Sequence, residues 1–239
     1  TFTIGHEAVG RVVEIGSGVV DIRPGDIVSI PWHIACGQCR RCVAGLPAHC
    51  ETFPSRAMFG HPMGGDWGGL FDDIVRVPFA DNMLVKLPAG VDPVAAASVS
   101  DNISIAWEVL SGEIARKPDA RVLILGGTPS IGLYCVDMAR ALGCTDVVYC
   151  DYSSQRLATA RNYGATCYKE GPSPTWGDFD IVVDASANVK WLQTGLQMVT
   201  PEGICDSVGI YFGEVGFPIY EMYMRATRFR IGRGNARMG

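Results

Sequence analysis

The spacing of apolar residues changes along the chain and divides it into two parts. In residues 1–98, short apolar stretches alternate with polar positions and end at glycine or proline turns, as in 7–16 and 21–30. Alternation with a period of two is typical of strands that bury one face. Residues 68–88 are predicted to add two further short strands. The first part is therefore expected to be an all-β domain.

From about residue 99 the pattern becomes one of strands that alternate with helices. Residues 101–115 predict a helix, and residues 121–127 form a continuous apolar run, as in a strand that is buried on both faces. The alternation then continues through predicted helices and strands at 130–143, 146–151, 153–164, 179–186, 189–199, 203–209 and 229–234. Strands and helices at this spacing predict a doubly wound parallel sheet over residues 99–239.

Composition narrows the class of protein further. The 239 residues are 48% hydrophobic and 19% charged, which is the balance of a packed globular protein. The formal net charge is −5 and no run of Lys and Arg occurs, which argues against a nucleic-acid surface or an anionic-membrane anchor. No apolar run is long enough to span a bilayer, and the first residues show no signal-peptide pattern. We expect a cytoplasmic protein, and because the first residue is Thr1, we also expect that its N-terminal segment is missing.

Four of the nine cysteines lie close together, with the spacing Cys36-x2-Cys39-x2-Cys42-x7-Cys50. Thiolates at such spacings can surround one tetrahedral Zn²⁺ ion, and Gly37 and Gly45 favour the turns between them. Disulfides, an iron–sulfur cluster and four unrelated thiols are alternatives. Disulfides would close very short loops, and Glu51 stands where ferredoxin-like clusters usually have proline. A structural zinc with four protein ligands is favoured, and such a site has no open position for a substrate.

A glycine turn follows the first strand of the second part. The stretch "LILGGTPSIGLYCVDMARALG" reads as strand, turn and helix, the arrangement in which backbone N–H groups receive a pyrophosphate. Gly127, Pro129 and Gly132 occupy the fingerprint positions, so proline stands where the middle glycine is usual. Gly126 is an additional glycine at the end of the strand. The turn, with Ile131 and Val208 as further contacts, predicts a nucleotide site.

An acidic residue stands at the end of the second predicted strand of residues 99–239. Asp151 lies about 20 residues beyond the glycine turn, where an acid accepts hydrogen bonds from the adenosine ribose. This position favours NAD over NADP, because a 2′-phosphate would face the carboxylate. Arg156 could lie near such a phosphate, although a solvated helix residue is the favoured interpretation. The alternative is that this part has a doubly wound fold but binds no nucleotide.

Four features occur in one order along the chain: "GHE" at residues 5–7, the cysteine lobe, an isolated acid at Asp101, and the glycine turn. Together they resemble the zinc-dependent medium-chain alcohol dehydrogenases over essentially the whole chain. The most specific stretches are "GHEAVGRVVEIGSGV", "RPGDIV" and "CGQCRRCVAGLPAHC". The resemblance implies a GroES-like β domain over residues 1–98, with a zinc lobe at about 34–52. A Rossmann dinucleotide-binding domain is implied over residues 99–239.

The resemblance also implies a second, catalytic zinc in the cleft between the domains. His6 matches the histidine ligand of the family, Glu7 the glutamate beside it, and Asp101 the third protein ligand. Taken alone, His6 could be a structural histidine, and Asp101 could cap the helix that begins at Asn102. The first catalytic cysteine of the family lies upstream of "GHE" and is not in this chain. We therefore expect an internal fragment that is itself inactive.

The implied activity is NAD(P)-dependent alcohol dehydrogenation, in which hydride passes between an alcohol, or the matching aldehyde or ketone, and NAD(H). Two alternatives remain open at this point. One is an enone or quinone reductase that has no catalytic zinc, and the other is a zinc-stabilised, non-catalytic NAD-binding module. The implied partners are a small-molecule substrate and further copies of the chain in a dimer or tetramer. The stretch "FRIG" at residues 229–232 is the expected edge strand.

Overall fold

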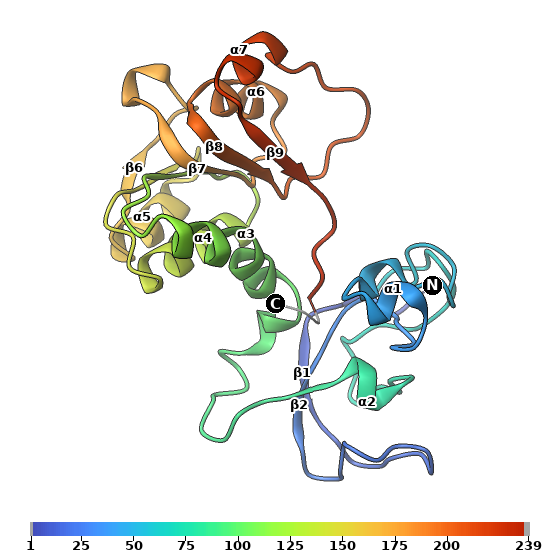
Figure 1. The fold of residues 1–239 in the computed structure, drawn as a ribbon. Coiled ribbons are helices and arrows are strands. Elements are labelled where there is room, and N and C mark those ends of the chain that lie inside the picture. Colours follow the sequence, from blue (N-terminus) through green and yellow to red (C-terminus); the bar gives the residue numbers. More distant parts are fainter. Residues whose placement is uncertain (1, 237–239) are drawn as a thin grey trace. The chain divides into compact units, whose positions relative to one another are not determined.

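The computed structural model describes residues 2–236, which form two compact units (Figure 1). The first unit runs up to Ile105 and includes the segment that begins at Gly234. The second unit is Ala106–Arg233. The division falls inside helix α3 (Asn102–Arg116), beyond the boundary at residues 98/99 expected from the change of period.

The first unit contains a three-stranded antiparallel sheet in the order β1-β2-β3. Its strands are β1 (Ala8–Arg11), β2 (Ile27–Ile30) and β3 (Val85–Lys86). In β2 the last three residues are buried, and the sheet packs on a core that includes Phe59 and Met83. The predicted all-β character of residues 1–98 is thus confirmed in class, although the strands are short.

The prediction of two strands within residues 68–88 was wrong, because only Val85–Lys86 pairs in the sheet. The exposed side chains of Phe71 and Ile74 find no sheet face to bury against. Residues Ala80–Met83 instead form a short helix, α2. Its Asp81 accepts N–H hydrogen bonds from the loop at Val20, Asp21 and Ile22 at 2.9–3.2 Å. A carboxylate that accepts hydrogen bonds from three backbone N–H groups stabilises the short helix that forms here instead of the expected strand.

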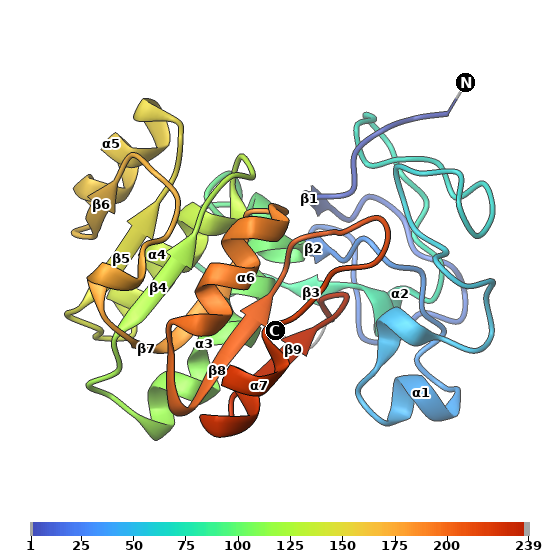
Figure 2. The ribbon, with the colours of Figure 1, turned by 90° about the horizontal axis from the view of Figure 1, so that it is seen from above.

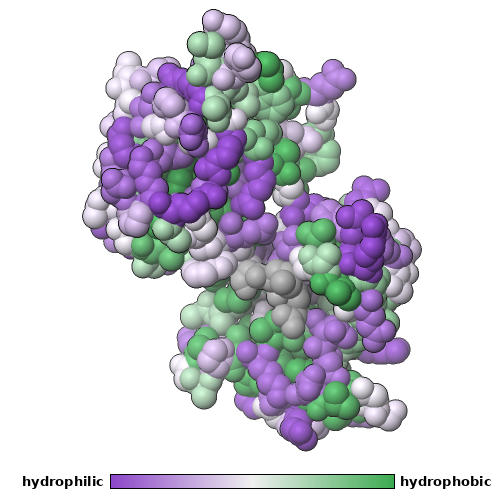
Figure 3. Space-filling view, in the orientation of Figure 1, coloured by the Kyte–Doolittle hydropathy of each residue, from purple (hydrophilic) through white to green (hydrophobic). Residues whose placement is uncertain are grey.

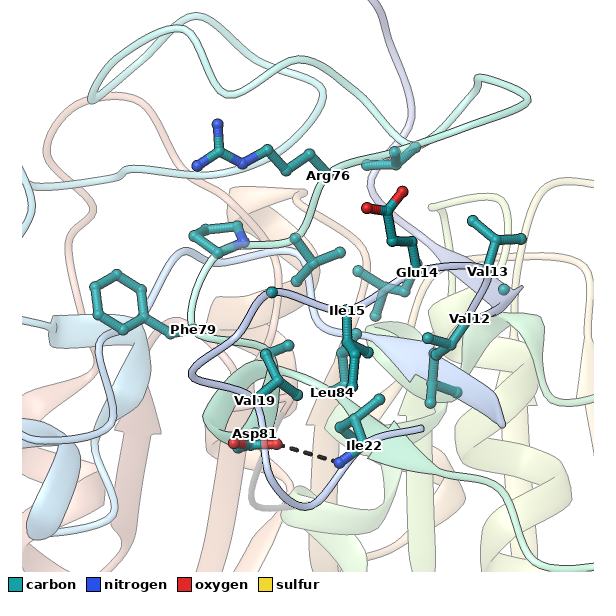
Figure 4. Close-up of a pocket in the computed structure, with 18 of the residues that line it drawn as sticks. Val12, Val13, Glu14, Ile15, Val19, Ile22, Arg76, Phe79, Asp81 and Leu84 are labelled. Atoms are coloured by element: carbon teal, nitrogen blue, oxygen red, sulfur yellow. Dashed lines mark hydrogen bonds between the residues drawn. The ribbon is translucent and has the colours of Figure 1, made fainter. Parts of the chain in front are cut away.

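Beside this sheet lies a cavity of about 660 Å³, lined by β1, the loop that follows it and residues 72–84 (Figure 4). Apolar side chains such as Val12, Ile15 and Val19 form much of its wall, with Glu14 and Arg76 among the polar lining residues. None of His6, Glu7 and Asp101 lines it. The cavity is therefore separate from the residues predicted to carry chemistry.

The second unit contains a six-stranded parallel sheet in the order β6-β5-β4-β7-β8-β9. Its strands are β4 (Val122–Leu125), β5 (Val147–Cys150), β6 (Thr166–Tyr168), β7 (Phe179–Asp184), β8 (Val199–Ser207) and β9 (Arg228–Ile231). Every residue of β4 and β5 is buried, as the continuous apolar runs predicted. The chain runs outward from β4 to β6, returns to β7 beside β4, and ends at β9 on the opposite edge.

Helices cover both faces of this sheet (Figures 1 and 2). α3, α4 (Ile131–Ala141) and α5 (Ser154–Asn162) lie on one face. On the other face, α6 (Val189–Gln197) and α7 (Ile219–Met224) are found. The predicted doubly wound fold is confirmed, whereas β6 and α7 were not predicted. Both are short, and their sequences carry no clear apolar period.

Short helical segments complete the fold. They are α1 (Arg40–Val43), η1 (Pro47–His49), η2 (Ala97–Ser100) and η3 (Pro174–Trp176). No helix in the described part of the chain is long and apolar enough to cross a membrane. On the face shown in Figure 3, hydrophilic and hydrophobic side chains are interspersed over both units.

Candidate functional site

The four cysteines of the lobe converge on one point. Their sulfur atoms all lie within 4.8 Å of one another. The Sγ atom of Cys50 is 3.7 Å from that of Cys36 and 3.9 Å from that of Cys39. Sulfur atoms at the corners of a tetrahedral zinc site, with Zn–S bonds of ~2.3 Å, lie ~3.8 Å apart. The donor set and its spacing therefore fit a zinc ion with four thiolate ligands.

Local geometry brings the sulfurs together. Gly37 and Gly45 adopt positive φ angles of 75° and 77°, so both predicted turns are confirmed. Between them α1 places Cys42 one turn after Cys39, and η1 leads directly into Cys50. The four cysteines are free thiols in this structure, so all four sulfur atoms are available as metal ligands.

Backbone N–H groups and a hydroxyl stabilise the thiolate forms. The N–H groups of Gln38 and Cys39 donate to Cys36 Sγ at 3.4 and 3.3 Å, and the Thr52 hydroxyl donates to it at 3.0 Å. Burial raises the pKa of Cys36, but these hydrogen bonds outweigh it and the pKa lies below its usual value. Backbone N–H groups of Glu51 and Cys42 lower the pKa of Cys39 to about 6.

Cys42 differs from these two cysteines. Burial, assisted by the neighbouring thiols, raises the pKa of Cys42 to about 12. Four crowded thiols cannot all ionise by themselves, since like charges oppose one another. A divalent cation removes this conflict, which is a second reason why the donor set fits zinc.

The arginines between the cysteines are paired with an acid. The side chains of Arg40 and Arg41 approach the Glu51 carboxylate, at 3.4 and 3.3 Å. The donors to the sulfur of Cys36 are instead backbone N–H groups, which the tight turn directs inward, and the Thr52 hydroxyl.

His6, Glu7 and Asp101 form a second cluster, although 95 positions separate His6 from Asp101 in the sequence. The Nε2 atom of His6 lies 3.3 Å from Oδ2 of Asp101. Two ligand atoms on a tetrahedral zinc, each ~2.0 Å from the ion, are ~3.3 Å apart. The His6 side chain is 43% exposed and that of Asp101 14%, so the pair is open to solvent on one side. An imidazole and a carboxylate in this arrangement can hold a zinc ion.

Gly5 fixes the position of His6. Its φ angle is +93°, and a Cβ atom there would lie 2.8 Å from the backbone nitrogen of Phe71. The Gly5 carbonyl accepts a hydrogen bond from the N–H of Leu70 at 2.9 Å. Glycine is therefore required in "GHE" because the chain passes close to residues 70–71 at this point.

Glu7 is held by two residues that the sequence reasoning missed. The Ser98 hydroxyl donates to Oε2 of Glu7, and the Asn102 side-chain amide donates to Oε1 at 2.7 Å. Ser98 lies in η2, which ends just before Asp101, and Asn102 is the first residue of α3. The Asp101 carbonyl accepts the first helical N–H, from Ile105 at 3.0 Å, while its carboxylate faces His6. The side chain is not a helix cap, so that alternative for Asp101 is removed.

The electrostatics of this cluster favour a positive charge. A hydrogen bond to Asp101 raises the pKa of His6 against the opposing effect of burial, and the carboxylates of Asp101 and Glu7 add to the rise. The same negative potential attracts a metal cation, which would take the place of the proton on Nε2.

The predicted glycine turn joins β4 to α4, at the carboxyl edge of the parallel sheet. Gly127 has a φ angle of +141°, and a Cβ atom there would lie 2.9 Å from the Ser186 carbonyl oxygen. No side chain caps the first turn of α4 at Ser130. The hydroxyl of Thr128 is buried and has no partner among the described residues. A turn with an orphaned hydroxyl and an uncapped helix N-terminus fits a bound pyrophosphate.

Tyr149 explains the additional glycine at residue 126 and was missed by the sequence reasoning. The ring of Tyr149 is fully buried in β5 beneath the turn. A Cβ atom on Gly126 would lie within 2.6 Å of the Tyr149 ring and of Asp151 Oδ2. The sequence did contain a sign of this contact. Residues two positions apart in an extended chain point to the same side, as Tyr149 and Asp151 do.

Asp151 accepts four hydrogen bonds, which the sequence did not predict. The Tyr149 hydroxyl and Nε of Arg156 donate to Oδ2, at 2.6 and 2.7 Å. The Ser153 N–H and Nη2 of Arg156 donate to Oδ1, each at 2.7 Å. The interpretation of Arg156 as a solvated helix residue was therefore wrong, because its first-turn position in α5 directs the guanidinium onto the acid. Arg156 lowers the pKa of Asp151 against the effect of burial.

Val208 and Gly209 lie at the carboxyl edge of the same sheet, just after β8. Both of their N–H groups donate to the backbone carbonyl of Asp184, at 2.9 and 3.1 Å. The buried carboxylate of Asp184 accepts hydrogen bonds from the hydroxyls of Ser186, Ser207 and Tyr211 at 2.6–2.8 Å. This network, which was not predicted, fixes the loop after β8 beside the glycine turn, since the Thr128 N–H also bonds Ala185 at 3.3 Å.

The cysteine lobe, the cluster at His6 and the Rossmann-type turn are features expected of the zinc-dependent dehydrogenase class, and comparisons with known proteins agree on the family. The family model "Alcohol dehydrogenase GroES-like domain" matches residues 1–89, and "Zinc-binding dehydrogenase" matches residues 130–235. The chain belongs to the zinc-dependent medium-chain alcohol dehydrogenase family.

Individual relatives show the extent of the similarity. The L-threonine 3-dehydrogenase of Pyrococcus horikoshii is 35% identical over 222 residues, which cover 89% of this chain and 60% of that protein. The zinc-type alcohol dehydrogenase B of Aspergillus flavus is 28% identical over 247 residues, which cover 97% of this chain and 56% of the relative. The solved structure of alcohol dehydrogenase TADH from Thermus sp. ATN1 superposes with a TM-score of 0.87 at 30% identity, covering 98% of this chain and 70% of that one. The chain thus spans a little over half the length of the curated relatives.

Proposed function

We propose that the protein is a zinc-dependent oxidoreductase that passes hydride between an alcohol, or the corresponding aldehyde or ketone, and a nicotinamide dinucleotide. The observation that carries the proposal is the 3.3 Å approach of His6 Nε2 to Asp101 Oδ2 in a cluster that also contains Glu7. Membership of the family and the relatives named as alcohol and threonine dehydrogenases support it. No feature of the structure favours the reductase or the non-catalytic module.

Each residue of the proposed site has a separate task. His6 and Asp101 would hold the catalytic zinc, and Glu7, fixed by Ser98 and Asn102, would keep negative potential beside it. When bound, the zinc would polarise the substrate oxygen as a Lewis acid, and the nicotinamide would accept the hydride. The residues predicted to bind the dinucleotide are Gly126, Gly127, Pro129, Ile131, Gly132, Asp151, Arg156 and Val208.

The cysteine lobe would have a structural role. Cys36, Cys39, Cys42 and Cys50 would occupy all four positions of its zinc, so no position is left for a substrate. We accordingly assign residues 1–98 as a partial GroES-like domain with a zinc lobe at about 34–52. Residues 99–239 are assigned as the dinucleotide-binding domain.

An experiment on the whole protein tests the catalytic zinc. Replacing Asp101 by alanine is expected to remove one of two zinc equivalents, because the remaining imidazole and its neighbours bind the ion weakly. The value of kcat/KM, measured at 340 nm with a panel of alcohols, should fall by at least about 100-fold, in line with loss of Lewis-acid stabilisation. Zinc content is measured by mass spectrometry. His6→Ala should behave in the same way.

His61→Ala is the matched control, since His61 is exposed and lies outside both clusters. It should keep both zinc equivalents and full turnover. The proposal would be refuted if the intact protein held a single zinc ion, or if Asp101→Ala turned over alcohols at the parental rate. The 239-residue chain alone is expected to be inactive.

The oligomer and the location are also proposals. β9 ends the sheet with three of its four residues exposed, which supports pairing with a second copy in a dimer or tetramer. All nine cysteines are free thiols, which supports a reducing compartment such as the cytoplasm.

A further inference from the structure

We propose that Tyr211 is a positioning residue for the coenzyme, because its hydroxyl holds the loop after β8 on the buried carboxylate of Asp184. The loop would thereby be fixed before the nicotinamide half of the dinucleotide binds to it. The inference rests on the proposed function, since it concerns the same dinucleotide site. It goes beyond that function, because it assigns a task to a residue that would act through the backbone of its own loop.

Asp184 lies at the point where the strand order of the sheet reverses. The chain runs from β4 outward to β6 and returns to β7 on the other side of β4. Ligands of doubly wound sheets bind outside the carboxyl ends of the strands at such a point. Asp184 is the last residue of β7, and its partners in the ladder are Leu125 at the end of β4 and Ser207 at the end of β8. It therefore lies one strand away from the glycine turn.

The two halves of the sheet divide the dinucleotide between them. Each half of a sheet of this kind takes one mononucleotide. The half formed by β4, β5 and β6 leads to Asp151, which marks the predicted adenosine side. The other half is formed by β7, β8 and β9. The loop after β8 is therefore left for the nicotinamide mononucleotide.

The Asp184 carboxylate is occupied by hydroxyl and N–H donors. Its residue is 0% exposed. The N–H and the hydroxyl of Ser186 donate to Oδ1 at 3.0 and 2.6 Å. The hydroxyls of Ser207 and Tyr211 donate to Oδ2 at 2.7 and 2.8 Å. Because a carboxylate accepts about four hydrogen bonds, Asp184 would act on a ligand only through the groups that it holds.

Tyr211 is the donor of this set that lies in the loop, beyond the end of β8 at Ser207. Its neighbours Ile210 and Phe212 are 73% and 97% exposed. The Tyr211 ring is instead half-buried and packs against the hydrophobic core between the sheet and α6. A single side chain thus anchors a stretch whose adjacent residues face solvent.

Gly209 and a protonated phenol make this contact possible. A Cβ atom on Gly209 would lie 3.2 Å from the Tyr211 ring and 3.0 Å from the backbone nitrogen of Ala187, so the two loops pass close together here. Burial, assisted by the Asp184 carboxylate, raises the pKa of Tyr211 above its ordinary value. The phenol therefore keeps, at neutral pH, the proton that it donates.

The consequence for binding is one of preorganisation. A loop that is fixed before the ligand arrives loses less conformational entropy when the ligand binds. Without the Tyr211 hydroxyl, this entropy loss would be added to the binding of the nicotinamide half. The adenosine half would bind on the other side of β4, so its affinity should be unchanged.

The experiment compares NADH with ADP-ribose, which has both riboses and the pyrophosphate but no nicotinamide. The 239-residue protein is titrated with NADH by fluorescence and with ADP-ribose by calorimetry. Tyr211→Phe, which keeps the ring, should raise the Kd for NADH by at least about fivefold and that for ADP-ribose by less than about twofold. The increase in nicotinamide emission on binding should also be smaller, because the ring is held less firmly.

Ser207→Ala is the matched control. It removes a hydroxyl from the same Oδ2 atom, but Ser207 belongs to β8 and is already held by the sheet. This variant should leave the ratio of the two Kd values unchanged. Tyr163→Phe, at an exposed tyrosine after α5, should change neither Kd, and circular dichroism should show that all variants are folded.

The possible failures are distinguishable. Equal losses for both ligands in Tyr211→Phe would indicate a merely structural role. That result, an unchanged NADH affinity, or the same shift of the ratio in Ser207→Ala would overturn the inference but leave the proposed function intact. If neither ligand binds to the parent protein, the proposed dinucleotide site is wrong and the inference falls with it.

Discussion

A Cys36→Ser variant is expected to lose one equivalent of zinc and to destabilise the first unit by about 3 kcal/mol or more. Cys36 is the most buried of the four cysteines, and its sulfur accepts hydrogen bonds from three neighbouring groups. The binding free energy of a structural zinc, roughly 10–16 kcal/mol in small zinc domains, is folding free energy, so a lost ligand removes part of it. Zinc content and calorimetric unfolding measure the two effects.

Cys167→Ser is the control for this prediction. Cys167 lies in β6 of the second unit, is partly buried and is not part of either cluster. This variant should keep its zinc and unfold within a few degrees of the parent. A Cys36→Ser protein with unchanged zinc content and unchanged unfolding would show that the lobe does not depend on a metal.

Gly126→Ala is expected to destabilise the second unit by about 1–3 kcal/mol, the usual cost of overpacking, and to weaken dinucleotide binding. The added Cβ would lie within 2.6 Å of Asp151 Oδ2 and of the Tyr149 ring, neither of which can move freely. Either the turn or the acid must shift, and both belong to the proposed coenzyme site. Urea unfolding and NADH titration provide the measurements.

A glycine-to-alanine change at an uncrowded position is the control, because it shows the effect of alanine without the close contacts. Gly112 lies in the exposed part of α3 with no atom within 4 Å of an added Cβ, so Gly112→Ala should stabilise the protein by about 0.5–1 kcal/mol. The combined Tyr149→Ala and Gly126→Ala variant should lose less stability than the sum of the two single losses, because the added Cβ and the Tyr149 ring share one space. Strict additivity of the two changes would contradict the packing argument.

Much of the fold followed from local patterns. Residues 122–125 are apolar at every position, a composition typical of a strand buried on both faces. The prediction failed at residues 68–88, where the sequence alternates but Ala80–Met83 form a helix. Asp81 of that helix accepts hydrogen bonds from the backbone N–H groups of residues 20–22. An alternating pattern makes a strand possible, but a strand also needs a neighbouring strand to bond with. Whether that neighbour is present depends on how the whole unit folds.

The sequence by itself determined the cysteine lobe, since four ligands within 15 positions can reach one ion through turns alone. It also determined the glycine turn and the acid after the second strand, because both are set by position within a strand–turn–helix unit. The pairing of His6 with Asp101 came only from the resemblance, and the tertiary structure supplied the distance between them.

Only the tertiary structure decided what surrounds these residues. The contacts of Glu7 with Ser98 and Asn102, of Asp184 with Tyr211, and of Tyr149 with Asp151 depend on where separate segments pack. A carboxylate can accept only about four hydrogen bonds. Whether it can still bind a ligand therefore depends on which donors surround it in the folded protein, and residue spacing in the sequence does not show this. Arg156 is the clearest example, since its place in the first turn of α5 directs its guanidinium onto the Asp151 carboxylate, which was expected to face the coenzyme.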